Sequence, residues 1–255
     1  MKDLEQTTTD MYNDFAYSYD ILMNDVDYKK RTEYLCSLFN AFDRMPTLML
    51  DLACGTGEFS NHFAKQGVSV IGVDVSYDML SVAREKTAEA GNDILYLCQD
   101  AAELDLYGTI DGAICCLDSL NHITDYDRFC KAIGRVSLFL EKDRLFIFDL
   151  NTEYKHREVL GNNTFVIDTD DIYCVWQNEY KENNTVEINL DFFVSDGDAY
   201  YRTGESFCER AYTKQEIANA IQKSGLKIEA AFDDISQNAP TDTTERVVYV
   251  TRKVK

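Results

Sequence analysis

A short glycine-rich turn and an acid beyond it are the residues of this chain best suited to bind a nucleoside cofactor. The apolar stretch 48–52 leads into the turn Gly55-Thr56-Gly57, and the next apolar stretch ends at Asp74. Glycine lets the backbone approach a ligand closely, and a helix that begins there offers free N–H groups. Because neighbouring parallel strands end at one crevice, Asp74 can bind the two hydroxyls of a ribose. The two motifs therefore predict a nucleoside-cofactor site.

Two details separate this site from a dinucleotide site. Ser60 stands where the third glycine of a G-x-G-x-x-G pattern would be, and Asp51 lies four residues before Gly55. Two further strand-like stretches follow, and they end at Asp100 and Asp118. This order of motifs resembles that of the class I S-adenosylmethionine-dependent methyltransferases, whose first motif reads acid-x-x-x-Gly-x-Gly.

The resemblance implies where each part of S-adenosylmethionine would lie. The methionine part would lie at the glycine turn, the ribose at Asp74, the adenine at Asp100 and the transferable methyl near Leu117. The cofactor-binding residues that the resemblance implies in these motifs are Asp51, Ala53, Cys54, Gly55, Gly57, Asp74, Val75, Met79, Asp100, Ala101 and Leu117.

An aromatic segment near the start of the chain extends the resemblance. Residues 12–20 are similar to a Tyr-x-x-Phe-Ala-x-x-Tyr-Asp segment of bacterial methyltransferases related to the sugar N,N-dimethyltransferases and to glycine N-methyltransferase. In that group the segment is a lid, which implies that Tyr12, Phe15 and Tyr19 close over the sulfonium. A cation is attracted to aromatic ring faces. Aromatic residues at helical spacing are also ordinary core residues, and this alternative stays open for Tyr12 and Phe15.

The pattern of elements predicts an α/β fold with a Rossmann-like, seven-stranded, mostly parallel sheet. Residues 10–43 have helical periodicity, and five strands alternate with helices up to Asp149. Ser76 and Thr124 are predicted to cap two of these helices, and Thr213 a later one. Two strands near residues 226–232 and 246–251 complete the sheet.

Between these parts the periodicity changes to two. From about residue 165 to residue 210 apolar and polar side chains alternate, which predicts an inserted antiparallel β lobe over the carboxyl edge of the sheet. We therefore expect a cofactor-binding domain with a helical lid at residues 1–153, the lobe at 154–210 and the rest of the methyltransferase domain at 211–255.

The candidate catalytic residues follow the fourth strand and the end of the lobe. His122 has a side chain that can act as a general base, and Asp118 and Asn121 can bind an ammonium group or orient a substrate. All three are also ordinary residues at a helix entry. Tyr212 belongs to a patch, residues 205–212, that is similar to a Glu-x-x-x-Arg-x-Tyr pattern of the resembled group but lacks its histidine. A buried Arg–Glu pair is the alternative reading of that patch.

Composition and charge argue against several other classes of protein. The chain has 255 residues, a net charge of −20 and no basic patch, which argues against a nucleic-acid partner. We expect no membrane span, a cytoplasmic location, reduced cysteines and no metal site, since the three histidines share no ligand spacing with cysteines or acids. The expected partner is a small-molecule substrate, and the expected assembly is a monomer or a homodimer.

The sequence thus predicts an S-adenosylmethionine-dependent methyltransferase that acts on a small molecule. N-methylation of an amine is the leading hypothesis, because an amine needs only to arrive deprotonated. O-methylation of a hydroxyl or carboxylate, with His122 as the base, is one alternative. A cofactor-binding regulatory protein without turnover is another.

Overall fold

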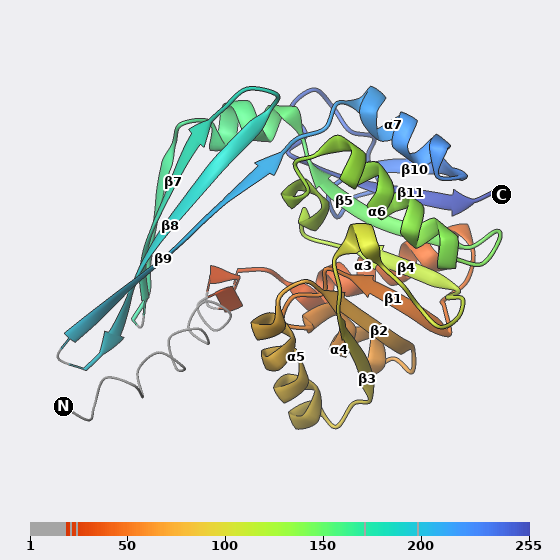
Figure 1. Ribbon diagram of the computed structural model, residues 1–255, viewed down its shortest axis with the longest axis horizontal. Helices are drawn as coiled ribbons and strands as arrows, with labels where there is room; N and C mark the ends of the chain where they lie inside the picture. Colours follow the sequence, from red (N-terminus) through yellow and green to blue (C-terminus); the bar gives the residue numbers. More distant parts are fainter. Residues whose placement is uncertain (1–18, 21, 24, 171, 198) are drawn as a thin grey trace.

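The computed structural model describes residues 19–20, 22–23, 25–170, 172–197 and 199–255. In this part of the chain the main sheet has seven strands in the order β10-β11-β5-β4-β1-β2-β3 (Figure 1). Strands β1 to β5 are parallel, whereas β11 pairs antiparallel with both β5 and β10. The predicted seven-stranded, mostly parallel sheet is confirmed. The strands are β1 Leu48–Leu52, β2 Ser69–Asp74, β3 Ile94–Cys98, β4 Gly112–Cys115, β5 Leu145–Asn151, β10 Leu226–Asp233 and β11 Arg246–Lys253.

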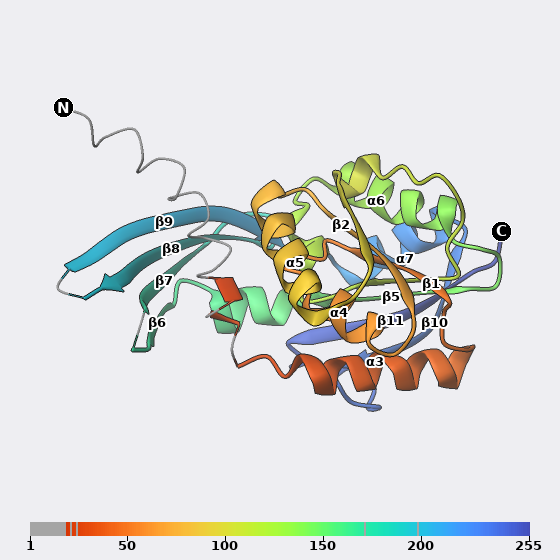
Figure 2. The ribbon, with the colours of Figure 1, turned by 90° about the horizontal axis from the view of Figure 1, so that it is seen from below.

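Five α-helices of the described chain cover this sheet: α3 Tyr28–Phe42, α4 Glu58–Ala64, α5 Tyr77–Ala90, α6 Tyr126–Phe139 and α7 Lys214–Lys223. One apolar cluster joins α3 and α4 to one face of the sheet, and a second joins α6 and α7 to the other face (Figure 2). The strands between them are buried on both faces, and every residue of β5 is buried. This accounts for the continuous apolar runs in the sequence.

Side chains at the helix starts explain where the helices begin. Ser76 Oγ accepts the N–H of Met79 at 3.2 Å, and Thr213 forms a capping box with Glu216, as predicted. The predicted cap at Thr124 is wrong by one residue. The carboxylate of Asp125 accepts the N–H of Arg128 at 2.9 Å, because its charge suits a helix N-terminus better than a hydroxyl does.

The helix predicted for residues 10–43 is interrupted in the described chain. Tyr19, Asp20 and Leu22 are helical, and α3 begins separately after Asp27, whose carboxylate accepts the N–H of Lys30 at 2.9 Å, and ends at Phe42. Residues 10–18 of that prediction lie outside the described residues, as do Tyr12 and Phe15.

The four-stranded sheet of the lobe is antiparallel throughout, in the order β6-β7-β8-β9. Its strands are β6 Thr164–Asp168, β7 Ile172–Tyr180, β8 Thr185–Asp196 and β9 Ala199–Arg210. The tight connection between β7 and β8 places Asn183 and Asn184 at positive φ, which asparagine tolerates. Figure 1 shows this sheet extending from the carboxyl edge of the main sheet, beyond β5 and η3, the π-helical turn Lys155–Leu160. The inserted antiparallel lobe is therefore confirmed.

One face of the lobe forms a small core of its own. Alternate residues of β7 and β8 are buried, among them Cys174, Ile188 and Phe192. Leu22 of the predicted lid segment, whose described residues are 19–20, 22–23 and 25–26, packs against them. No helix in the described part of the chain is long and apolar enough to cross a membrane.

Candidate functional site

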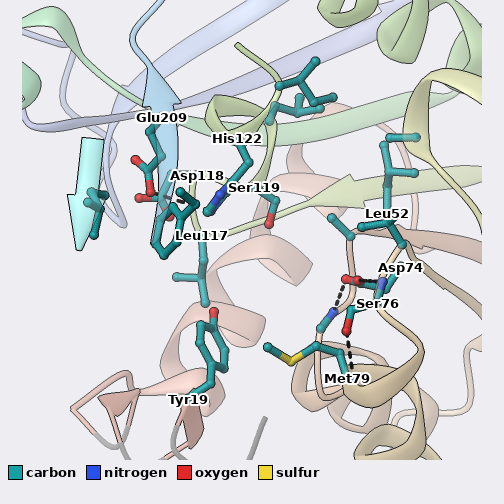
Figure 3. Close-up of a pocket in the computed structure, with 18 of the residues that line it drawn as sticks. Tyr19, Leu52, Asp74, Ser76, Met79, Leu117, Asp118, Ser119, His122 and Glu209 are labelled. Atoms are coloured by element: carbon teal, nitrogen blue, oxygen red, sulfur yellow. Dashed lines mark hydrogen bonds and ion pairs between the residues drawn. The ribbon is translucent and has the colours of Figure 1, made fainter. Parts of the chain in front are cut away.

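A cavity of about 800 Å³ lies beyond the carboxyl ends of β1, β2 and β4, where the lobe and Tyr19, Leu22, Met23 and Val26 also reach. Figure 3 shows Asp74, Ser76 and Met79 on one side of it and His122 and Glu209 on the other, with Leu117 between them. Open parallel sheets bind ligands at this edge. The size suits a cofactor together with a small second ligand.

The glycine turn is held in a conformation that few side chains adopt. Gly55 and Gly57 have φ of +54° and +78°, and Ala53 has φ of +55°. The carboxylate of Asp74 accepts the N–H of Gly55 and that of Ser76, both at 2.9 Å. Burial raises the pKa of Asp74, and these backbone hydrogen bonds partly offset the rise. The acid at the end of β2 therefore stabilises the turn and also faces the cavity.

Asp51 lies beneath the same turn with few partners. Its side chain is 2% exposed, and one of its oxygens accepts the hydroxyl of Ser60 at 2.6 Å. Burial raises the pKa of Asp51 to about 7, against the hydrogen bond from Ser60. A smaller recess lined by Asp51, Cys54 and Tyr19 opens beside the main cavity. Burial also raises the pKa of the Cys54 thiol well above its usual value, so the thiol stays neutral.

The lid residue Tyr19 lines both cavities. Burial first, and then the charges of Asp118 and Asp20, raise the pKa of Tyr19, so the phenol stays protonated. The neighbouring Asp20 accepts the hydroxyl of Thr56 at 2.7 Å and pairs with Lys86 at 2.6 Å. The lid is thereby tied to the glycine turn.

The predicted adenine side also lines the cavity. Asp100 accepts the N–H of Ala102 at 2.8 Å through one oxygen and pairs with Arg128 at 2.5 Å through the other. Val75, Met79 and Ala101 lie around it on the cavity wall.

The end of β4 is held by groups that the sequence does not reveal. Leu117 and Asp118 both have positive φ, at +56° and +54°. Their N–H groups donate to the carboxylate of Asp149 at 2.9 and 2.6 Å, and Arg246 donates to Asp149 at 2.6 Å. Burial opposes ionisation of Asp118, but the Arg246 guanidinium lowers its pKa to about 2. Asp149 lies two residues before the end of β5 and Arg246 begins β11, so the two residues are far apart in the chain.

Two predicted catalytic residues lie in the core instead of on the cavity wall. Asn121 is fully buried, and its amide donates to the carbonyl of Arg210 at 2.8 Å and accepts the N–H of Asn151 at 3.0 Å. Tyr212 is 3% exposed and donates to the carbonyl of Ile123 while its ring stacks on Phe129. Asn121 joins the end of β9 in the lobe to β5 in the main domain. Tyr212 holds the segment that follows β9 against the main domain. Their structural contacts leave no group pointing at a substrate.

His122 lies on the cavity wall beside an acid from the lobe. Its Nε2 is 3.6 Å from Oε1 of Glu209, and its ring centroid is 5.0 Å from that of Phe207. The other oxygen of Glu209 lies 3.5 Å from Nε2 of His156. Glu209 is 6% exposed, and its amide partner is Asn151 at 3.3 Å. In the sequence, Glu209 belongs to the patch at residues 205–212, for which a buried Arg–Glu pair was the alternative interpretation. Its contact with His156 was not predicted, because that contact depends on the lobe folding back.

The described residues hold no cluster of three or more His, Cys, Asp or Glu side chains placed to bind a metal ion.

Comparison with known proteins gives the class of this cavity. Residues 49–137 match the family described as methyltransferase domain. YqeM of Bacillus subtilis (strain 168), whose name carries a provisional methyltransferase assignment, is 30% identical over 96% of this chain and 98% of its own. An S-adenosylmethionine-dependent methyltransferase from Clostridium acetobutylicum ATCC 824 has 35% identity and a TM-score of 0.89 over 96% of this chain and all of that one.

A more distant structure shares the fold. The sugar N-methyltransferase KedS8 from Streptoalloteichus sp ATCC 53650 superposes with a TM-score of 0.78 at 16% identity, over 92% of each chain. The fold and the glycine turn followed by acid-ended strands define an S-adenosylmethionine-dependent methyltransferase. The chain belongs to the class I family of these enzymes. Its cofactor is S-adenosylmethionine, and the enzyme prediction is confirmed over the regulatory alternative.

Proposed function

We propose that this enzyme transfers a methyl group from S-adenosylmethionine to the nitrogen of a small-molecule amine. The acceptor would lie in the part of the cavity between the end of β4 and the lobe, with the lobe at residues 154–210 acting as a separate substrate-shaping unit. The resemblance of the sequence to sugar N,N-dimethyltransferases and glycine N-methyltransferase also favours this proposal.

The residues that line the cavity fit the cofactor. Asp51 is a buried carboxylate with one hydroxyl partner, so the ammonium group of the methionine part would supply the positive charge that it lacks. Asp74 would accept the ribose hydroxyls, and Asp100 with Ala101 and Val75 would meet the adenine. Tyr19 and Leu117 would lie at the sulfonium, which supplies an activated methyl group. Gly55 and Gly57 let the backbone come close to the methionine part.

Glu209 is the observation that carries the amine proposal. It is a buried carboxylate on the acceptor side, and within the described residues its ion-pair partners are two histidines and no lysine or arginine. An imidazole carries charge only when both of its ring nitrogens hold a proton. An amine that arrives as ammonium would bring both a positive charge and a proton to this carboxylate.

The hydrogen bond of the His156 ring supports a role for the cluster in holding a proton. Its Nδ1 lies 3.0 Å from the carbonyl oxygen of Asn184, and a carbonyl can only accept, so Nδ1 carries a hydrogen. Its Nε2 then faces the Glu209 carboxylate, and the contact is attractive when a proton lies on either partner. His122, on the other oxygen, is 47% exposed, and either it or water beside it can take the proton that an ammonium nitrogen loses before that nitrogen attacks the methyl, so an amine acceptor does not depend on His122 alone.

A second candidate, O-methylation, has one observation in its favour. Lys155 lines the cavity, and its ammonium donates to Oδ1 of Asn151 at 3.1 Å. A lysine here could bind a carboxylate acceptor or stabilise an alkoxide. His122→Ala separates the two reactions, because a hydroxyl must lose its proton in the transition state and an amine loses it earlier. We expect a loss of less than about tenfold with an amine and on the order of 10²–10⁴-fold with a hydroxyl acceptor.

The test uses sets of three acceptors that differ only in the nucleophile, namely an amine, the matching alcohol and the matching carboxylic acid. With ¹³C-methyl S-adenosylmethionine, the chemical shift of the product methyl identifies the atom that received it. We expect an N-methyl product and a kcat that rises with pH as the bound ammonium loses its proton. Methyl found on oxygen alone would contradict the proposal.

Variants of two lobe acids test the role of Glu209. Glu209→Gln removes the charge that would bind an ammonium, and kcat/KM for the amine should fall by about 10–150-fold, since hydrogen bonds to charged groups contribute about 1.5–3 kcal/mol. Binding of S-adenosylhomocysteine should change by less than about twofold. Glu187→Gln on β8 is the matched control. Glu187 pairs with Lys181 at 3.0 Å and does not line the cavity, so this variant should behave as wild type.

A further inference from the structure

The wall that the lobe presents to the cavity is apolar. Trp176 of β7 pairs with Leu190 of β8, and Ile188 of β8 pairs with Phe207 of β9. All four side chains line the cavity, and Ile167 of β6 adds a fifth. Paired residues on one face of an antiparallel sheet lie side by side, so these side chains form a continuous surface.

The lid segment faces this wall with apolar side chains of its own. Leu22, Met23 and Val26 line the cavity, and Leu22 also packs against the lobe core. The part of the cavity between lid and lobe is therefore bounded by hydrocarbon on both sides.

The one polar side-chain atom among the five residues of this wall is already paired within the lobe. Nε1 of Trp176 donates to Oδ1 of Asn178 at 2.7 Å, so the ring meets the cavity as an apolar surface. The Phe207 ring lies beside the His122 imidazole, with centroids 5.0 Å apart. The apolar wall thus begins next to the cluster that would receive the amine.

Packing of the lobe alone does not require this surface. Ile188 and Leu190 belong to the lobe core and are nearly buried, but Trp176 and Phe207 only flank that core and stay partly exposed toward the cavity. Two large rings left facing a cavity gain free energy when an apolar ligand displaces water from them.

Resting on the proposed amine transfer, we propose that the acceptor has an apolar body, an alkyl chain or an aromatic ring, attached to its amine. The body lies between Trp176 and Phe207 on the lobe and the lid segment, and the nitrogen lies at His122 and Glu209. A polyhydroxyl body such as a sugar would lose its water hydrogen bonds against this wall, because the five side chains of the wall offer it no partner.

The experiment uses the fluorescence of Trp176, which is the chain's one tryptophan. Ethylamine, butylamine, hexylamine and phenethylamine are titrated into the enzyme saturated with S-adenosylhomocysteine, with glucosamine as the polyhydroxyl comparison. Each methylene buried against the wall should tighten binding about fourfold. Hexylamine and phenethylamine should bind at least tenfold more tightly than glucosamine.

Two phenylalanines on opposite faces of the lobe are the matched variants. Phe207→Ala should weaken hexylamine binding about tenfold or more. Phe193→Ala should leave it within about twofold, because Phe193 lies on the other face of β8 against Tyr173 and Arg202.

The outcomes separate this inference from the proposed function. Affinity that is independent of chain length, no fluorescence change with any amine, or tighter binding of glucosamine would overturn the apolar-body inference, even if amines are methylated. Affinity that rises with chain length and depends on Phe207 supports the apolar-body inference. A methyl found on an atom other than nitrogen would overturn only the amine transfer.

Discussion

Asp51 shows how a single side chain in this enzyme can favour binding at the cost of stability. It is buried under the glycine turn with the Ser60 hydroxyl as its hydrogen-bond donor, and Asp74 lies close enough to disfavour its charge. A cationic ligand group would remove that penalty. The cofactor-free enzyme should therefore carry an electrostatic strain that the cofactor relieves.

We predict that Asp51→Asn stabilises the cofactor-free protein at alkaline pH. The pKa of Asp51 is about 7 when folded and 3.8 in the reference state, so between these values the folded state binds more protons than the unfolded state. The free energy of unfolding of the wild type should then fall as pH rises from about 4 to about 7. At pH 8 the variant should be more stable by a few kcal/mol, at about 1.4 kcal/mol per pKa unit.

Urea unfolding at pH 5 and pH 8 checks this prediction, and calorimetry should show that the same variant binds S-adenosylhomocysteine more weakly. Asp111→Asn is the control of opposite sign. Burial of Asp111 is outweighed by hydrogen bonds from Leu48 and Thr47 and by Arg44, which together lower its pKa. That variant should be destabilised. An Asp51 variant with the same pH dependence as wild type would contradict the account.

A second prediction concerns Asp74 and the ribose. Asp74→Ala should weaken S-adenosylhomocysteine binding by about 1–3 kcal/mol, because sugar hydroxyls would lose an acceptor in a partly dry site. Asp74→Asn should lose less, since its amide oxygen can still accept the N–H of Gly55. Asp78→Ala, four residues further along on α5, should bind as wild type in the same calorimetric titration. Equal affinity of Asp74→Ala and wild type would remove Asp74 from the site.

The ends of β4, β5 and β11 act together at the level of elements. Asp118 and Asp149 are both within 3.2 Å of the Arg246 guanidinium. Asp149 also accepts hydrogen bonds from the N–H groups of the two residues with positive φ that follow β4, Leu117 and Asp118. Burial opposes the charge on Arg246, but the two carboxylates raise its pKa. Arg246 of the antiparallel strand β11 therefore holds the segment after the parallel strand β4 in position, and this segment carries Leu117 on the cavity wall.

We predict that Arg246→Met destabilises the enzyme by about 3–5 kcal/mol, because it leaves two carboxylates buried without a cation. Arg202→Met is the matched control. It breaks another Arg–Asp pair, with Asp191, but that arginine is 65% exposed, and the loss should be below about 1 kcal/mol. Thermal unfolding compares the two. A small effect of Arg246→Met would show that water or lid residues meet the carboxylates instead.

Local patterns made much of this site predictable, and long-range contacts account for what was not. The glycine turn and the acids at the ends of β2 and β3 are readable because one strand–turn–helix unit contains each of them. Asp149, Arg246 and His156 were missed, because their roles depend on strands that meet only when the sheet and the lobe close. Asn121 and Tyr212 were assigned to catalysis because they follow the right elements, but sequence position does not tell whether a side chain points into the cavity or into the core.

At the scale of the whole molecule, the lobe is an insertion whose two ends meet. The carbonyl oxygen of Asn184 lies 3.0 Å from Nδ1 of His156 and 3.0 Å from the N–H of Ala211. The chain therefore leaves the main domain and returns to it at nearly the same point. A short linker could join residue 156 to residue 211 without stretching the main sheet.

The last prediction follows from this geometry. Replacing residues 157–210 with a Gly/Ser linker of roughly four residues should leave binding of S-adenosylhomocysteine within about tenfold of wild type, because the cofactor side of the cavity is built from β1, β2 and β3 and their loops. Methyl transfer should fall below detection, because Glu209 and the apolar wall are removed. Circular dichroism and calorimetry measure folding and cofactor binding on the same sample.

A milder deletion is the control for this experiment. Removing residues 194–201 and closing the β8–β9 hairpin with Asn-Gly shortens the lobe beyond Ile188 and Leu190 and keeps the cavity wall. That variant should retain both cofactor binding and methyl transfer. If the variant without the lobe also turned over normally, the acceptor would have to bind within the main domain, against His122 and Lys155 alone, and the lobe would serve a different partner.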